Sequence, residues 1–163
     1  MSNMKERPEF TDEQLKIVRF CAIECELQQS GEQSVWWMLR AWEYALDHNN
    51  RRPTPDDVIR LGALVDPPKN AGGFRRVGVR VGWDVKGDWQ NVPRQVANLC
   101  SADALAALSP AEWFRQYEEA HPFRDGNGRT GQILFNWLND TLHAPVWAPN
   151  FWNHHRREPG YGA

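Results

Sequence analysis

The sequence predicts a mainly α-helical fold with a small β-hairpin, and two observations support this prediction. Through most of the chain, apolar residues recur at helical spacing between the capping residues that mark where helices begin. One stretch, Phe74–Val81, instead alternates with a period of two and ends at Gly82, which is typical of a strand in a hairpin. With 163 residues the chain is long enough to bury one core, so we expect a single domain.

Capping signals place the helices of the first half in order. Thr11, with Gln14 three residues later, forms a capping box that opens the first helix. Thr54 and Pro55 supply an N-cap and a proline at the first helical position of the third. Proline, glycine and asparagine in residues 66–73 predict a loop before the strand. The helices expected in this half cover residues 11–29, 32–48 and 54–65.

The second half predicts further helices on either side of a loop. Ser109 and Pro110, with Glu112 behind them, are a strong start signal. The helix that they open must end near His121, because Pro122 disfavours helical backbone at the residue before it. The expected helices here cover residues 91–100, 101–108, 109–121 and 127–142, followed by an aromatic tail without periodicity.

Composition narrows the class of protein. A formal net charge of −2 argues against a general nucleic-acid binder, and no apolar run is long enough to cross a membrane. No signal peptide is visible, and an odd number of cysteines, three, suggests a reduced cytoplasmic protein. Cys21 and Cys25 are expected to be buried thiols, since nearby metal partners are lacking.

Nine tryptophans are unusual for this length, and core packing is the default role for those that fall in helical patterns. We expect them in the core rather than in an aromatic ligand cage. The five in helical patterns are Trp36, Trp37, Trp42, Trp113 and Trp137.

The run from His121 to Arg129 contains the candidate catalytic and binding residues. A histidine with an ordinary pKa near 6.5 suits general-base catalysis at neutral pH. Asp125 supplies a carboxylate of the kind that holds Mg²⁺. Gly126 and Gly128 let main-chain N–H groups converge on an anion at a helix start, where Arg129 could bind a phosphate. The plainer alternative is a surface histidine followed by an ordinary turn.

This run resembles the signature of Fic-domain proteins, H-x-F-x-(D/E)-G-N-(G/K)-R-x-x-R, and every fixed position but the last matches. The segment from Gly73 to Val79 is similar to the flap that precedes the signature in that family. The resemblance implies a Fic-type helical bundle with a hairpin flap. It divides the chain into an N-terminal helical segment of the same domain, 1–53, a Fic-like core, 54–142, and a tail, 143–163.

The resemblance implies Mg²⁺-dependent transfer of AMP from ATP to a serine, threonine or tyrosine hydroxyl of a target protein. His121 would take the hydroxyl proton and Asp125 would bind Mg²⁺. The flap would dock the target by strand pairing. The expected nucleotide-binding residues are Phe123, Gly126, Asn127, Gly128, Arg129 and Gln132, and Phe123 is also expected to pin the loop to the core. The expected docking residues are Phe74, Arg75, Val77, Val79 and Val81.

Gln132 departs from the family pattern, which has an arginine at that position to hold the γ-phosphate. The inhibitory (S/T)-x-x-x-E-(G/N) helix of many members also has no good match here, and only residues 2–6 have its spacing. Inhibition of the enzyme would then come from a separate antitoxin or regulator. Two alternatives stay open: a phosphotransferase of the same fold, whose Doc-like members carry lysine where this chain has Gly128, and a catalytically weak interaction module.

Overall fold

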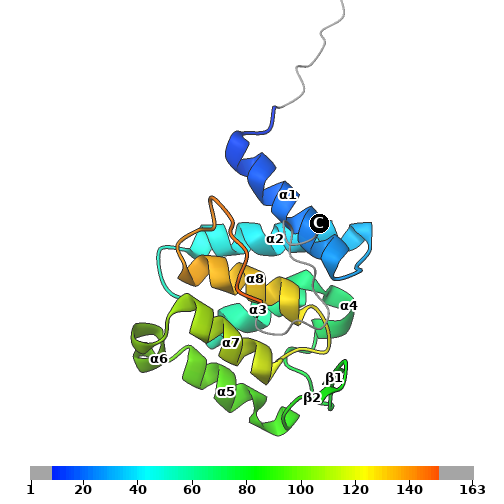
Figure 1. The fold of residues 1–163 in the computed structure, drawn as a ribbon, viewed down its shortest axis with the longest axis vertical. Helices are drawn as coiled ribbons and strands as arrows, with labels where there is room; N and C mark the ends of the chain where they lie inside the picture. The colour runs from blue at the N-terminus through cyan, green and yellow to red at the C-terminus, as the bar shows by residue number, and fades with distance from the viewer. Residues whose placement is uncertain (1–8, 151–163) are drawn as a thin grey trace, which may run out of the picture.

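The computed structural model describes residues 9–150, and the fold is mainly helical with one two-stranded hairpin (Figure 1). The segment 2–6 and the end of the tail lie outside these residues. Within the described range no helix is long and apolar enough to cross a bilayer. The elements are α1 (Asp12–Leu27), α2 (Glu32–His48), α3 (Pro55–Val65), α4 (Pro67–Asn70), β1 (Arg80–Val81), β2 (Asp84–Val85), a 3-10 turn (Trp89–Asn91), α5 (Val92–Leu99), α6 (Ala102–Ala107), α7 (Pro110–Ala120) and α8 (Asn127–Leu138).

The predicted mainly helical fold is confirmed, and the predicted capping residues begin α1, α3 and α7. Thr11 and Thr54 each form a complete capping box, and the Ser109 hydroxyl accepts the N–H of Glu112. The predicted end of the last helix was wrong. α8 ends at Leu138 rather than near Leu142, because the chain turns at Asp140, which adopts a left-handed backbone with φ of 57°.

The predicted loop 66–73 was also wrong in part, because it contains the short helix α4. Asp66 caps this helix: its side chain accepts the N–H of Lys69 at 3.3 Å. Two prolines follow Asp66, and proline is favoured in the first helical turn, where its missing N–H costs nothing. The capping pattern is the same as at α3, in a much shorter element.

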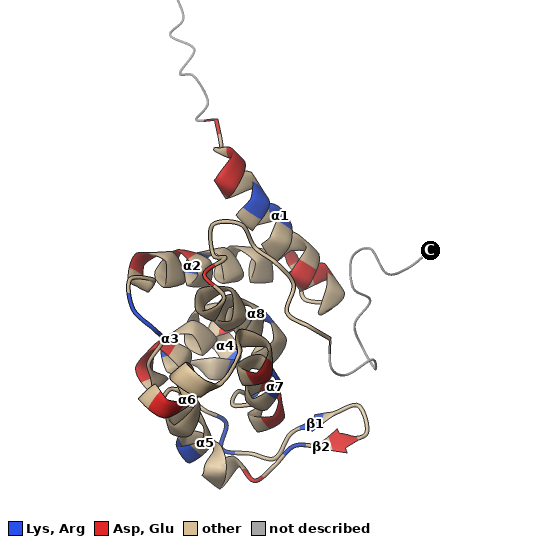
Figure 2. Cartoon of the chain, turned by 60° about the vertical axis from the view of Figure 1, so that its left-hand side comes forward, with Lys and Arg blue, Asp and Glu red and all other residues tan. Residues whose placement is uncertain are grey.

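The predicted strand is shorter than expected, since only Arg80–Val81 pairs, in antiparallel register with Asp84–Val85. Gly82 makes the tight turn between the strands with a positive φ of 59°, which favours glycine. Residues 74–79 leave strand geometry because Arg75 is drawn inward, where its N–H donates to the Pro122 carbonyl at 2.8 Å. The hairpin therefore projects from the side of the bundle near the end of α7 (Figure 2).

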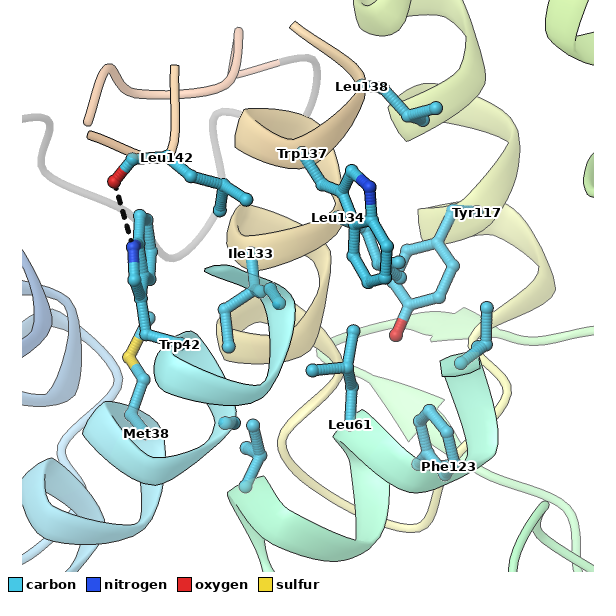
Figure 3. Close-up of a cluster of buried hydrophobic side chains, with 14 of the residues drawn as sticks. Met38, Trp42, Leu61, Tyr117, Phe123, Ile133, Leu134, Trp137, Leu138 and Leu142 are labelled. Atoms are coloured by element: carbon cyan, nitrogen blue, oxygen red, sulfur yellow. Dashed lines mark hydrogen bonds between the residues drawn. The ribbon is translucent and has the colours of Figure 1, made fainter. Parts of the chain in front are cut away.

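The core surrounds α8, whose residues are all buried except Gly128. Side chains of α8 point in different directions, Ile133 toward α2 and Trp137 toward α7 (Figure 3). Helices α2, α3 and α7 all pack on α8, and residues of α1 and α2 share the same apolar cluster. Helices α1 and α2 thus complete the apolar core that the later helices form.

The tryptophans divide between core and surface. Trp42, Trp113 and Trp137 are buried as expected, and each indole N–H donates to a main-chain carbonyl, of Leu142, Leu99 and Arg51 respectively. Trp37 is half-buried. The expectation for Trp36 was wrong, because it lies on the outer face of α2 with 66% of its surface exposed. Cys21 and Cys25 are buried as expected, and burial raises the pKa of both thiols.

A polar cluster around Asp57 joins α2 to the start of α3. The buried Asp57 carboxylate accepts hydrogen bonds from the Tyr44 hydroxyl at 2.7 Å and from the guanidinium of Arg51. The N–H and hydroxyl of Thr54 also donate to it, at 2.7 and 2.8 Å. Burial opposes ionisation of Asp57, but these donors outweigh burial and hold its pKa well below the ordinary value.

We predict that Asp57→Asn lowers the free energy of unfolding by about 3 kcal/mol at pH 7, because the donors around this buried side chain lose their charged acceptor. Asp56→Asn is the matched control, since Asp56 is exposed in the same helical turn. The stabilisation is fully present above the unfolded carboxyl pKa, about 3.9, and is lost as pH falls through the lower folded value. Urea unfolding at pH 7 and pH 3 measures it, and a gap between the two variants that does not shrink at pH 3 would contradict this account.

Candidate active site

The loop between α7 and α8 is held closed by one side chain. The Asn127 amide accepts the N–H of Phe123 at 2.8 Å and donates to the carbonyl of the same residue at 2.9 Å. Phe123 is fully buried against α3 and Phe74, with ring centroids 5.6 Å apart, which agrees with its expected packing role. The ring therefore fixes the loop to the core, and the expected contact of Phe123 with a nucleotide stays a prediction.

His121 follows the last residue of α7 in a left-handed conformation, with φ of 45° and ψ of 64°. Its ring is partly exposed, but the Nδ1 atom is buried. Burial lowers the pKa of His121 to about 4, and the nearby charges of Lys86 and Arg75 add to this effect. The imidazole is therefore neutral at physiological pH, which is the form that accepts a proton.

Asp125 presents its carboxylate at the mouth of the loop, with 45% of the side chain exposed. One oxygen accepts the N–H of Gly126 at 2.7 Å, and the other forms an ion pair with Lys69 of α4. Burial acts against ionisation, yet these contacts keep the pKa of Asp125 below its ordinary value. The Asp125 carboxylate is thus ionised and already paired with the Lys69 ammonium group.

The start of α8 has the backbone features that favour an anion. Gly126 adopts a positive φ of 72°, and no side chain caps the helix, so the first main-chain N–H groups are left for a ligand. The approach to Gly128 is close, because a Cβ there would lie 2.8 Å from Nε2 of Gln28 at the end of α1. The end of α1 therefore forms one wall of the site.

Arg129 lies in the first turn of α8 with only 4% of its side chain exposed. Its Nη2 lies 3.6 Å from a carboxylate oxygen of Asp66 and 3.7 Å from one of Asp125. This arginine therefore has counter-charges without a bound anion, in the carboxylates of Asp66 and Asp125. The two carboxylates hold the guanidinium beside the helix start, and its Nε has no partner in the described part of the chain.

A family model described as the Fic/DOC family matches residues 53–139, more than half of the chain. The matched range includes α3 to α8, the hairpin and the whole loop. The chain belongs to the Fic/DOC family. The matched range contains the run from His121 to Gln132.

Gln132, the one departure from the Fic-domain signature, is fully buried. Its Oε1 accepts the N–H of Ala148 at 3.0 Å, and its Nε2 has no hydrogen-bond partner within residues 9–150. Asn136, one turn later, donates to the carbonyl of Val146 and accepts its N–H, both at 2.9 Å. In this Fic/DOC protein Gln132 and Asn136 therefore hold residues 146–148 against α8, and the expected contact of Gln132 with a nucleotide stays a prediction.

Arg75 also differs from its expected role in docking, because it is buried beneath the hairpin with 2% of its surface exposed. Its guanidinium donates to the carbonyls of Val77 at 2.9 Å and Gly87 at 2.7 Å, one at each end of the hairpin. It also donates to the carbonyl of His121 at 2.7 Å. Arg75 thus fixes the hairpin to the residue that carries the candidate base.

The other expected docking residues lie at or near the surface, with Val77 exposed and Phe74, Val79 and Val81 half-buried. Trp83, at the tip of the hairpin, was missed, although 96% of its surface is exposed. Sequence reasoning also missed Lys69, Asp66 and Gln28. A polar residue in a loop or at a helix end carries no signal of which distant group it meets, so only the fold brings these three to the site.

We predict that Gln132→Arg lowers the free energy of unfolding by about 2–4 kcal/mol, since a longer charged side chain would be forced into a packed site. Gln132→Leu is the comparison and should lower it by only about 1–2 kcal/mol, because it leaves the buried N–H of Ala148 without its acceptor but places no charge in the core. Urea unfolding and proteolysis near residue 148 report on both variants. A Gln132→Arg protein as stable and as protected as wild type would mean that the segment does not depend on this side chain.

Proposed function

We propose that this protein transfers AMP from ATP to a serine, threonine or tyrosine hydroxyl of a target protein. The observation that carries the proposal is the grouping, in one closed loop, of a neutral imidazole, an exposed carboxylate and an uncapped helix start. Membership of the Fic/DOC family supports a transferase, and these three groups are the ones that nucleotide transfer to a hydroxyl requires.

In this reaction the target hydroxyl oxygen forms a bond to the α-phosphorus of ATP, and the bond from that phosphorus to the departing pyrophosphate breaks. His121 accepts the proton of the attacking hydroxyl. A base with a pKa of about 4 is unprotonated throughout the neutral range, so its availability does not limit the rate there. Its main chain is held by Arg75, which keeps the ring in place without using either ring nitrogen.

The phosphates would bind at the start of α8. Main-chain N–H groups after Gly126 and the guanidinium of Arg129 point to this position, and both favour negative charge. Phosphotransferases of the same fold have lysine where this chain has Gly128. This chain lacks that lysine, which favours nucleotidyl transfer over phosphoryl transfer.

Asp125 would hold Mg²⁺ as the only protein carboxylate in the loop. The fit is supported by its half-exposed side chain and by the cation, Lys69, that already sits on one of its oxygens. Magnesium is commonly held by one or two carboxylates together with substrate phosphates. When bound, the ion would neutralise charge on the phosphates and favour departure of pyrophosphate.

We predict transfer of label to a protein from ATP labelled on its α-phosphate, when the purified chain is incubated with a cell lysate and Mg²⁺. His121→Ala should lower this transfer about 10²–10⁴-fold without unfolding the protein. The wild-type rate should be nearly flat between pH 6 and pH 8. Transfer from the γ-phosphate instead would indicate a phosphotransferase, and no transfer from either would favour an interaction module.

The projecting hairpin is proposed to dock the target as an added strand, with Trp83 as an apolar anchor. Exposed strand edges favour pairing with another chain, and tryptophan is frequent among the residues that dominate interface energies. Gly82 holds Trp83 at the tip, away from the core.

We predict that Trp83→Ala lowers target modification at least tenfold and leaves stability and ATP affinity unchanged, because the side chain touches nothing else that would lose packing. Trp36→Ala is the matched control, since Trp36 is an exposed tryptophan on α2. Label transfer and ATP titration are measured on both variants. Equal modification by Trp83→Ala and wild type would remove the hairpin tip from the docking surface.

A further inference from the structure

Lys69 reaches the candidate metal position from outside the family signature. It is the third residue of α4, 56 positions before Asp125, and its ammonium group is paired with the Asp125 carboxylate. Slightly more than half of its side chain is exposed, at 53%. The end of this side chain therefore lies beside Asp125 with both groups open to solvent.

The backbone that carries Lys69 is fixed relative to the loop. The amide of Asn70 donates to the carbonyl of Asp125 at 2.9 Å and to the carbonyl of Gly62 at 3.0 Å. Asp66 caps α4 at its other end. Because the main chain is tied to both α3 and the loop, only the flexible lysine side chain can change position when a ligand binds.

The charges around this point balance without a ligand. Two cations, Lys69 and Arg129, face two carboxylates, Asp66 and Asp125. A divalent metal ion on Asp125 would repel the ammonium group at hydrogen-bond distance. Lys69 would then have to leave Asp125, and phosphate oxygens bound at the start of α8 are the acceptors within its reach that a nucleotide would add.

We infer that Lys69 has two functions at this site, resting on the function proposed above. In the nucleotide-free protein it occupies the cation position on Asp125 and competes with divalent metal. When a metal-bound nucleoside polyphosphate enters, its ammonium group moves to the phosphate oxygens and adds a second cationic contact to that of Arg129. It is a phosphate-binding residue that the signature does not contain.

The two functions predict opposite effects of one substitution, which a merely structural lysine would not produce. Lys69→Ala should bind Mn²⁺ roughly tenfold more tightly than wild type without nucleotide, because the competitor is gone. The same variant should bind ATP roughly tenfold more weakly at saturating Mg²⁺, because a charge-assisted contact is lost. Lys69→Arg should keep ATP affinity near wild type, and Lys16→Ala, on α1, is the control for loss of one positive charge.

Mn²⁺ binding is followed by the electron paramagnetic resonance signal of the free ion, and ATP binding by calorimetry. Unchanged Mn²⁺ affinity in Lys69→Ala would overturn the competition, and unchanged ATP affinity would overturn the phosphate contact. Asp125→Asn separates this inference from the proposed function: if it leaves Mn²⁺ affinity unchanged, the metal position itself is wrong. If label transfer fails while both binding shifts occur, Lys69 stands as a nucleotide-binding residue of a non-catalytic site.

Discussion

The structure depends on a helix that is buried on nearly every side and yet carries polar residues. Helix α8 contributes apolar side chains to the core together with Asn127, Arg129, Gln132 and Asn136, all less than 5% exposed. Buried polar groups are costly unless they are hydrogen-bonded or paired, so these residues find partners in the segments that surround the helix. These partnerships determine how the loop, the site and the C-terminal segment are arranged around one helix.

This arrangement connects the residues of the candidate site to the core. Asn127 sets the shape of the loop, and Arg129 draws Asp66 and Asp125 toward the helix start. Arg75 then connects the hairpin to the end of α7, so the base and the proposed docking element share one support. A site supported in this way is preorganised, because little of it has to be ordered when ligands bind.

Local patterns predicted what depends on neighbours in sequence. The helix starts followed from Thr11, Thr54 and Ser109, and the candidate base and carboxylate followed from nine consecutive residues. The sequence could not predict that Lys69 meets Asp125, since no period or motif relates residues 56 positions apart. It also could not predict the burial of Arg75. Residues 74–79 alternate in sequence as a strand does, although their backbone leaves strand geometry where the Arg75 N–H binds the Pro122 carbonyl.

The C-terminal segment is recognised by its main chain. Leu142, Val146 and Ala148 are held on α2 and α8 through their backbone carbonyl or N–H groups, which every residue other than proline possesses. Three side chains add apolar contacts: Trp147 stacks on Phe20 with ring centroids 4.0 Å apart, and Leu142 and Ala148 are buried in the core. The exposed positions between them, such as Val146, are bound through the main chain alone and can therefore diverge in evolution more freely than the helix beneath them.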